Sequence, residues 1–259
     1  LGFVNSVTRS FVPVENCLLM HDSINETLQI LQGHCGETSQ LSIRYGVNCE
    51  SLLIQPKLST LEPNIVTGQK YYYENLNGQK FRVGSPSFFQ VNTLQAEAMG
   101  EIAKKMLETT GKEILVDAYA GVGVFAALLA PFVKKVFALE ESVAAIKDSN
   151  ENLRDFTNVE SLQGRVEDLL PNLNPSPDLV LLDPPRTGCH PRTLQALINS
   201  PPTRILYVSC DPSTLSRDLE ILTAGPFQIG KVQPIDLFPH TYHIEAMVSL
   251  FKYEKKCSI

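Results

Sequence analysis

No two cysteines of this chain are spaced as a CxxC pair, although the sequence contains six cysteines, at positions 17, 35, 49, 189, 210 and 257. Closed zinc sites use closely spaced ligand pairs, and secreted disulfide scaffolds are short and dense in cysteine. We therefore predict no metal site and no disulfide framework. Reduced thiols indicate a cytoplasmic protein, or an organellar one if upstream sequence carries a transit peptide.

Long apolar runs and a secretory signal are also absent. No stretch approaches the length of about 20 apolar residues that a membrane-spanning helix needs. Leu1-Gly-Phe-Val has neither the basic start nor the apolar core of a signal peptide. We expect no membrane partner. The chain does not begin with methionine, so we expect a fragment or a processed product.

Basic residues are fewer than acidic residues in this chain. The chain has 22 Lys and Arg against 28 Asp and Glu, a net charge of −6 and a pI near 5.4. This balance argues against a nucleic-acid-binding protein, which usually carries a basic face. It does not exclude one, because a local basic strip can coexist with an acidic total. A length of 259 residues with 43% hydrophobic residues fits one large or two smaller globular domains.

Two regions differ in texture. Residues 1–84 alternate short apolar or aromatic runs with turn signals, among them Asn77-Gly78, which predicts a hairpin turn. Residues 25–32 predict a short helix. We interpret this region as a small α+β domain and residues 85–259 as a second domain.

The second region alternates strand and helix patterns. Strands are predicted at 113–117, 135–140, 178–183 and 204–210, and helices at 92–108, 122–130, 142–153, 191–199 and 213–222. Such alternation predicts parallel strands joined by right-handed crossover helices, hence an α/β, Rossmann-like sheet. The runs 231–237 and 245–253 predict a terminal antiparallel hairpin on the edge of that sheet.

The four predicted parallel strands end in Asp117, Glu140, Asp183 and Cys210, which would share one carboxyl edge. Open α/β sheets bind ligands at that edge, so four such residues indicate a site. A thiol there can be a nucleophile, although free cysteine is also a common buried core residue. Asp211-Pro212 breaks the last strand, and we expect Ser213 or Thr214 to cap the helix that follows.

Asp117 leads into a turn with Gly121 and Gly123, which allows a ligand close to the backbone. Glu140 lies where dinucleotide folds bind ribose hydroxyls. Nicotinamide-dependent dehydrogenases share these features. The third glycine of their fingerprint is missing, which favours a nucleoside cofactor without a pyrophosphate.

Three other features each have two interpretations. Asp183-Pro-Pro-Arg186 forms a stiff loop, either an ordinary rigid turn or one like those of methyltransferases acting on planar base nitrogens. Glu245 would reach the site if its strand runs antiparallel, and is otherwise a surface charge. His240 and His243 could suggest a metal, but no third ligand has suitable spacing.

Together these residues resemble the RNA 5-methyluridine (uracil-C5) methyltransferase family, with its transfer-RNA and ribosomal-RNA members. The resemblance is strong over 85–259 and looser over 1–84. Five motifs carry it: Phe88-Phe-Gln-Val-Asn92, Asp117-Ala-Tyr-Ala-Gly-Val-Gly123, Leu182-Asp-Pro-Pro-Arg-Thr-Gly188, Tyr207-Val-Ser-Cys-Asp-Pro212 with its following Thr214-Leu and Arg217-Asp, and Asp236-Leu-Phe-Pro-His-Thr-Tyr-His-Ile-Glu245.

The resemblance implies an S-adenosylmethionine-dependent enzyme that methylates C5 of a uridine in structured tRNA or rRNA. It implies that Cys210 is the nucleophile and Glu245 the base that removes the C5 proton. The cofactor contacts it implies are Gln90, Tyr119, Gly121, Glu140 and Asp183, and the substrate contacts are Phe88, Arg186 and His240. Phe88 and Phe89 are candidate stacking surfaces, with core packing the expected role of one of them. The family often has asparagine where Asp211 stands and a polar residue where Val124 stands.

Full-length relatives commonly carry an N-terminal oligonucleotide-binding barrel, and some carry an iron–sulfur cluster. Cys17 resembles the fourth cluster ligand, and the other three have no counterpart in this chain. We therefore predict no cluster in this fragment, and a monomer. Two alternatives stay open: an RNA-binding factor without catalysis, and a methyltransferase for another base or a small molecule. The sequence does not identify the RNA or the uridine.

Overall fold

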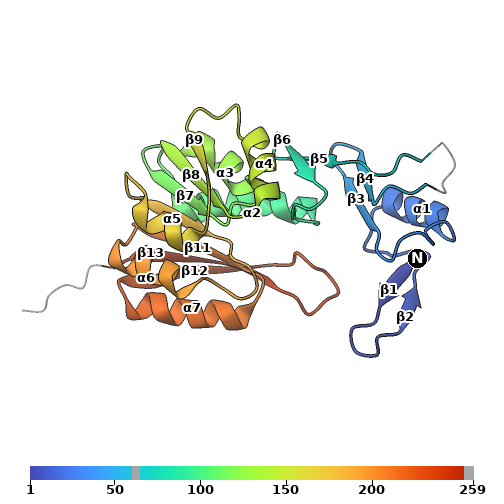
Figure 1. The fold of residues 1–259 in the computed structure, drawn as a ribbon. Helices are drawn as coiled ribbons and strands as arrows, with labels where there is room; N and C mark the ends of the chain where they lie inside the picture. The colour runs from blue at the N-terminus through green and yellow to red at the C-terminus, as the bar shows by residue number, and fades with distance from the viewer. Residues whose placement is uncertain (60–64, 254–259) are drawn as a thin grey trace, which may run out of the picture. The chain divides into compact units, whose positions relative to one another are not determined.

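A computed structural model describes residues 1–59 and 65–253 of the chain. It divides into two compact units, Leu1–Ser85 and Pro86–Ile259, which are described separately here. The thin grey traces in Figure 1 mark the residues outside the described ranges.

The first unit is small and built from hairpins and one helix. Each of its three two-stranded sheets is antiparallel. The expected helix at 25–32 is present and begins earlier, because the His21 side chain accepts a hydrogen bond from the Ser23 amide. In chain order the elements are β1 (Gly2–Val4), β2 (Phe11–Pro13), α1 (Asp22–Leu31), β3 (Ser42–Gly46), β4 (Ser51–Gln55), β5 (Tyr71–Leu76) and β6 (Gln79–Gly84).

The turn predicted at Asn77-Gly78 is confirmed. It joins β5 to β6, with Leu76 paired to Gln79. Asn77 has a φ of 50° and Gly78 a φ of 83°. Both central residues are therefore left-handed, as a two-residue turn matching the twist of its strands requires, and Asn-Gly is the pair that adopts it most readily.

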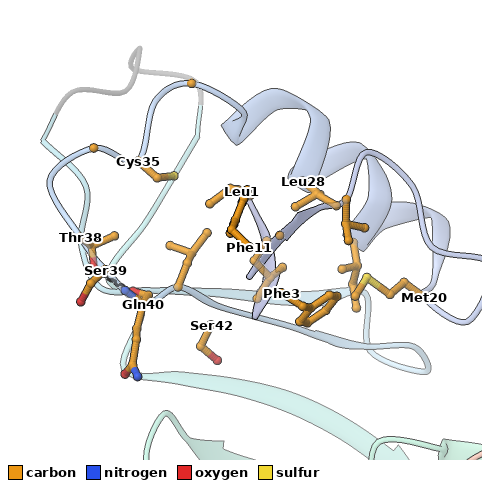
Figure 2. A pocket seen from close by; sticks show the side chains of 17 residues that line it. Leu1, Phe3, Phe11, Met20, Leu28, Cys35, Thr38, Ser39, Gln40 and Ser42 are labelled. Carbon is orange, nitrogen blue, oxygen red and sulfur yellow. Dashed lines mark hydrogen bonds between the residues drawn. The ribbon is translucent and has the colours of Figure 1, made fainter. Parts of the chain in front are cut away.

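An apolar pocket of about 680 Å³ lies within the first unit. Figure 2 shows Phe3 and Phe11 of the β1–β2 hairpin facing Leu28 of α1 across it. None of the residues lining this pocket is a predicted site residue.

The second unit is a seven-stranded sheet of order β12-β13-β11-β10-β7-β8-β9. The five strands from β11 to β9 in that order are parallel, and β13 pairs antiparallel with both β11 and β12. The strands are β7 (Ile114–Ala118), β8 (Lys135–Glu140), β9 (Val159–Gln163), β10 (Leu179–Leu182), β11 (Arg204–Ser209), β12 (Phe227–Ile235) and β13 (Glu245–Lys252).

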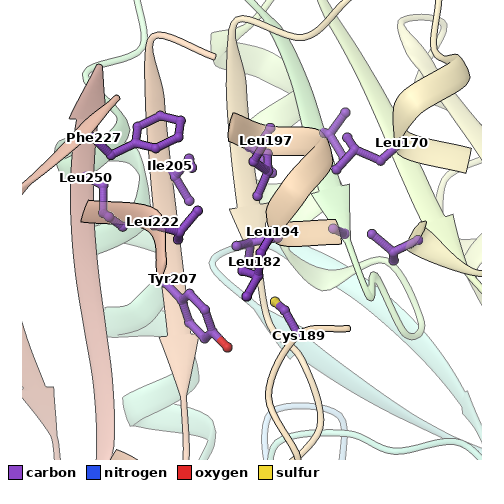
Figure 3. Packing of buried hydrophobic residues seen from close by; sticks show 14 of the residues in the cluster. Leu170, Leu182, Cys189, Leu194, Leu197, Ile205, Tyr207, Leu222, Phe227 and Leu250 are labelled. Carbon is purple, nitrogen blue, oxygen red and sulfur yellow. The ribbon is translucent and has the colours of Figure 1, made fainter. Parts of the chain in front are cut away.

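Helices cover both faces of this sheet (Figure 1). On one side are α2 (Thr93–Leu107), α3 (Val124–Leu129) and α4 (Val143–Asn152), and on the other α5 (Val166–Leu169), α6 (Pro191–Asn199) and α7 (Pro212–Ala224). Two short 3₁₀ turns, Ala130–Phe132 and Leu170–Asn172, follow α3 and α5. Figure 3 shows the core between the sheet and α6 and α7, where Leu194, Leu197 and Leu222 pack on Ile205 and Tyr207.

The predicted parallel α/β sheet with a terminal antiparallel hairpin is confirmed, with two corrections. A fifth parallel strand, β9, was not predicted, because it is a half-exposed edge strand without the apolar run that marks the central ones. The helix after Cys210 is capped by Asp211, whose side chain accepts from the Ser213 and Thr214 amides, rather than by Ser213 or Thr214. A carboxylate at this position satisfies two amides that the helix itself leaves unbonded.

Candidate functional site

Cys210 and Glu245 meet at the carboxyl edge of the sheet. Strands β11 and β13 pair with Ser209 opposite Ala246, and the same register continued by one residue places Cys210 opposite Glu245. Directly opposed residues of an antiparallel pair have Cα atoms about 4.5–5.5 Å apart and side chains on the same face. The thiol and the carboxyl group can therefore contact neighbouring atoms of the same bound substrate.

Glu245 is buried, with 3% of its surface exposed. Burial, together with the negative charge of Asp183, raises the pKa of its carboxyl group to about 8. Burial also raises the pKa of Asp183 to about 7. A carboxyl group with such a pKa exchanges its proton near neutral pH, as a general base must. Glu245 is thus not the surface charge that its place at the start of a strand allows.

The Cys210 thiol is partly buried, and burial is the main cause that raises its pKa. The charge of Glu245 raises it as well. Arg186 opposes both through its positive charge and a hydrogen bond to the thiol. The arginine comes from the loop after β10, so this loop supplies a cation that favours the thiolate form.

The loop after β7 is built around two acidic side chains. Asp117 is buried and accepts a hydrogen bond from the Ala126 amide at 2.8 Å. Glu140, at the end of β8, accepts from the Gly121 amide at 2.8 Å and the Ser142 amide at 2.7 Å. One carboxylate thereby fixes two neighbouring loops. Each of its oxygens keeps a second acceptor direction for a ligand hydroxyl.

Backbone geometry shapes the same loop. Tyr119 has a φ of 66° and Gly123 a φ of 88°. A side chain at Gly123 would also collide with Leu153 and with Ser149. At Gly121 nothing lies within 4 Å of an added Cβ, so the space beside its backbone is open to a ligand.

A pocket of about 400 Å³ opens beside these loops, within the usual range for small-molecule sites. Tyr119, Glu140 and Pro185 line it from the loops after β7, β8 and β10. Gly164 and Val166 line it from the loop after β9. Since β9 was not recognised in the sequence, the residues after it were not predicted as part of a site.

The predicted residues in the segment before α2 differ from one another in exposure. Phe88 is 69% exposed, whereas Phe89 is 6% exposed and belongs to the core, as expected for one of the two. The Gln90 side-chain oxygen is buried and has no hydrogen-bond partner. A buried acceptor without a partner carries a desolvation cost, which a ligand donor would relieve.

The predicted residues fall into three groups. Electrostatic coupling links Asp183, Glu245, Cys210 and Arg186 into one cluster. Tyr119, Gly121 and Glu140 form the neighbouring pocket wall and its turn. His240 is exposed in the loop between β12 and β13.

Asp117 was noted at a strand end but not predicted as a site residue. Burial raises the pKa of its carboxyl group to about 8 against the lowering effect of the Ala126 amide, and the charges of Asp183 and Glu140 contribute to the rise. The Asp117 carboxyl group therefore interacts electrostatically with Glu140 of the pocket wall and with Asp183 of the Cys210 cluster. Its sequence signal was the same as that of Glu140, an acidic residue after an apolar run.

Among residues 1–59 and 65–253, no group of three or more His, Cys, Asp or Glu side chains is placed to hold a metal ion. Cys17, Cys35, Cys49, Cys189 and Cys210 are free thiols, and Cys257 lies outside the described residues. No helix in the described part of the chain has the length and apolar character to cross a membrane.

Comparison with known proteins gives three results. Residues 165–253 match the model of the tRNA (uracil-5-)-methyltransferase family. An uncharacterized RNA methyltransferase of Gloeobacter violaceus is 39% identical over 187 residues, covering 71% of this chain and 40% of that protein. Another, of Clostridium acetobutylicum, is 29% identical over 311 aligned residues, covering 98% of this chain and 68% of that protein. The chain thus spans about two fifths of the Gloeobacter relative.

A solved structure has the same fold. It is the Pyrococcus abyssi tRNA (uracil-54, C5)-methyltransferase in complex with S-adenosyl-L-homocysteine, with a TM-score of 0.76 and 24% identity, covering 93% of this chain and 70% of that one. The Rossmann-like methyltransferase fold expected from the sequence is confirmed. The match of residues 165–253 to the family model and the two RNA methyltransferase relatives agree with the resemblance to this family found in the sequence.

Proposed function

We propose that this chain transfers a methyl group from S-adenosyl-L-methionine to C5 of a uridine in structured RNA, through a covalent bond between Cys210 and C6. The observation that carries the proposal is the electrostatic effect of buried Glu245 on the Cys210 thiol, which directly follows the pair Ser209–Ala246 at the end of the β11–β13 ladder. A methyltransferase for a more nucleophilic atom needs neither a thiol nor a buried base at this position.

The residues beside the pocket fit S-adenosylmethionine. Glu140 offers acceptors to ribose hydroxyls, and Gly121 leaves room beside its backbone. The buried Gln90 oxygen has no partner in the protein and can accept from a ligand amine. Burial raises the pKa values of the Asp117 and Asp183 carboxyl groups, and a cation bound nearby would favour their ionised forms. When bound, the cofactor supplies an electrophilic methyl group on a positively charged sulfur.

Cys210 acts first in the proposed mechanism. Its thiolate adds to C6 of uracil, and the electrons of the C5–C6 double bond move onto the ring as an enolate. This step makes C5, otherwise a poor nucleophile, able to accept the methyl group, with S-adenosylhomocysteine as the leaving product. Covalent catalysis in this way divides one difficult step into easier ones.

Glu245 completes the reaction. After transfer, C5 carries both its proton and the new methyl group. The Glu245 carboxylate takes the proton, the electron pair re-forms the C5–C6 double bond, and the S–C6 bond breaks to release Cys210. The position of Glu245 opposite Cys210 suits removal of a proton from the carbon adjacent to the thioether.

The RNA must present its base outside the helical stack, because C5 and C6 are inaccessible within it. Exposed Phe88 is the proposed stacking surface for such a base, and Arg186 is proposed both to stabilise the thiolate and to contact the RNA. His240, on the exposed β12–β13 loop, is proposed as a further substrate contact. We assign catalysis to residues 85–259 and RNA contact to residues 1–84. The Pyrococcus abyssi neighbour acts on uracil 54 of tRNA, which makes tRNA the first substrate to test.

The proposal is tested by incubating the protein with S-adenosylmethionine and unmodified transcripts of tRNA and rRNA, followed by mass spectrometry of the nucleosides. The expected product is 5-methyluridine with the native protein and none with Cys210→Ala. Turnover that persists in Cys210→Ala, or methylation at another atom, would refute it.

A further inference from the structure

Asp218 is a buried carboxylate that the proposed chemistry does not use. It lies on α7 with 0% of its surface exposed. One oxygen accepts from the Cys189 amide at 2.8 Å and from the Tyr207 hydroxyl at 2.6 Å. The other accepts from Arg217, at 2.8 Å from Nε and 2.7 Å from Nη2. A buried charge needs such partners, and here they come from β11, from α7 and from the loop after β10.

These bonds tie the loop after β10, which carries Asp183 and Arg186, to α7. Besides the bond from the Cys189 amide, Arg217 donates to the Thr187 carbonyl at 2.9 Å. The Thr214 hydroxyl donates to the Arg186 carbonyl at 3.1 Å. Figure 3 shows the Tyr207 side chain beside Cys189, which belongs to this loop.

Gly188 permits the close approach. Its φ is 77°, and an added Cβ would lie 2.4 Å from the Arg217 Nη2 and 2.7 Å from the Asp218 Oδ2. Any side chain at this position would therefore push the loop away from Asp218. The absence of a side chain at Gly188 thus allows the loop to pack directly against the Asp218 carboxylate.

Helix α7 also fixes Cys210. The helix begins at Pro212 and is capped by Asp211, the residue that directly follows the cysteine. The thiol and the loop that carries Arg186 are thus fastened to the same helix. Arg186 contributes the positive charge and hydrogen bond that act on the Cys210 thiol against the charge of Glu245.

We propose that Asp218 is a positioning residue: it holds the loop after β10 against α7, so that the Arg186 guanidinium stays beside the Cys210 thiol. The inference concerns the same site as the proposed function and rests on it for its catalytic meaning. Its physical content, the placement of Arg186 beside Cys210, can be measured without RNA or cofactor.

The test is the rate at which iodoacetamide alkylates Cys210, followed by peptide mass spectrometry between pH 7 and pH 10 in Asp218→Asn. Loss of the bonds that hold the loop moves Arg186 away from the thiol. We expect the pKa of Cys210 to rise, which slows its alkylation by about ten-fold at pH 8. Removing a negative charge would by itself lower the pKa of a thiol, so the expected direction reports position rather than charge.

Two internal cysteines serve as references. Cys189 is buried and reports unfolding, whereas Cys49 lies in the other unit and reports reagent activity. Glu220→Gln is the matched control, because it removes the same charge from an exposed position of α7. It should leave the Cys210 rate unchanged. Thr214→Val, which removes the hydroxyl bonds to the Arg186 and Asp211 carbonyls and leaves those of Asp218 in place, should slow alkylation in the same direction by a smaller factor.

Slower alkylation of Cys210, with Cys189 still protected from iodoacetamide, supports the proposal. An unchanged Cys210 rate in both variants overturns it. Faster alkylation of Cys210 together with Cys189 overturns it as well, since Asp218 would then be a general anchor of the fold. If Asp218→Asn does not fold, Thr214→Val decides. If nucleoside analysis finds no 5-methyluridine while alkylation still slows, the proposed function fails and the positioning role stands.

Discussion

Cys210 directly follows β11 and Glu245 begins the antiparallel neighbour β13, one residue beyond the last paired residues, Ser209 and Ala246. The negative charge of Glu245 raises the pKa of the Cys210 thiol. A Cys210 thiolate would in the same way make ionisation of Glu245 less favourable. A thiolate and a carboxylate this close together repel each other, so the free enzyme seldom holds both in the ionised form. The arrangement suits a reaction in which the thiolate is consumed by addition before the carboxylate acts.

Replacement of Cys210 should abolish methyl transfer. Without the thiol, C5 of uracil is too weak a nucleophile, so Cys210→Ala and Cys210→Ser should reduce 5-methyluridine to background. Cofactor binding, measured by calorimetry, should change little, because Cys210 does not line the pocket. Cys49→Ala, in the other unit, is the matched control and should retain activity.

Activity should rise with pH between about 6 and 9. The pKa of Glu245 is raised to about 8 and that of Cys210 above its usual range, both mainly by burial. Each residue acts in its ionised form, so the active fraction grows as pH increases through those values. The measurement is single-turnover methyl transfer against pH. A rate that falls over this interval would contradict the assignment of both residues.

Thiol reactivity offers a separate test of the same coupling. Above pH 8 the Glu245 carboxylate is ionised and opposes the Cys210 thiolate. Glu245→Gln removes that charge and should lower the pKa of Cys210, which speeds its alkylation by iodoacetamide. Below about pH 7, where Glu245 holds its proton, native protein and variant should react alike. Equal rates at every pH would show that the two groups are not neighbours.

Glu140 should be required for cofactor affinity. Its carboxylate orders the Gly121 and Ser142 amides and faces the pocket. Hydrogen bonds to charged groups contribute about 1.5–3 kcal/mol, so Glu140→Gln should weaken S-adenosylhomocysteine binding by about ten-fold or more. Glu160→Gln, on the exposed edge strand β9, is the control, and calorimetry is the measurement. Unchanged binding in Glu140→Gln would place the ribose elsewhere.

Stability of the ligand-free protein should fall as pH rises from about 5 to about 8. The pKa values of Asp117, Asp183 and Glu245 in the folded protein are raised to about 8, 7 and 8. The folded state therefore binds more protons than the unfolded state between pH 4 and 8, and the stabilisation present below pH 4 is lost over this interval.

Thermal denaturation at several pH values measures this effect. Each extra bound proton gives a slope of about 1.4 kcal/mol per pH unit, hence a few degrees in Tm. Asp183→Asn should reduce the slope and raise the Tm at pH 8. A Tm that increases toward pH 8 in the native protein, with no change in the variant, would contradict the raised pKa values.

The sequence predicted the second unit well where local pattern and tertiary structure agree. Strand β8 and helix α6 have the predicted bounds, because an apolar run or an amphipathic repeat marks each from end to end. Edge strand β9 has neither mark, since water covers much of it. Its loop, with Gly164 and Val166, was therefore missed although it lines the pocket.

Glu140, Asp183 and Cys210 followed from a rule about strand ends, whereas the other site residues followed from the resemblance, and the limits of the rule are clear in two cases. Glu245 could be placed only by knowing that β13 inserts between β11 and β12 and brings its first residue to the buried edge. Asp218 belongs to the Arg217-Asp motif but received no role, because an acidic residue inside a helix carries no periodic signal. Its importance depends on bonds to Cys189 and Tyr207, which lie 29 and 11 residues away in the chain.

The covalent intermediate is the most direct test of the account. Glu245→Gln, incubated with S-adenosylmethionine and a 5-methyluridine-free substrate RNA, should accumulate a protein–RNA adduct that migrates slowly on a denaturing gel and disappears on nuclease treatment. The adduct forms because Cys210 adds to C6 and the methyl group is transferred, while the C5 proton stays in place. Cys210→Ala combined with Glu245→Gln should give no adduct. An adduct that survives the loss of Cys210, or its absence from Glu245→Gln in an RNA that the native protein methylates, would contradict the proposed mechanism.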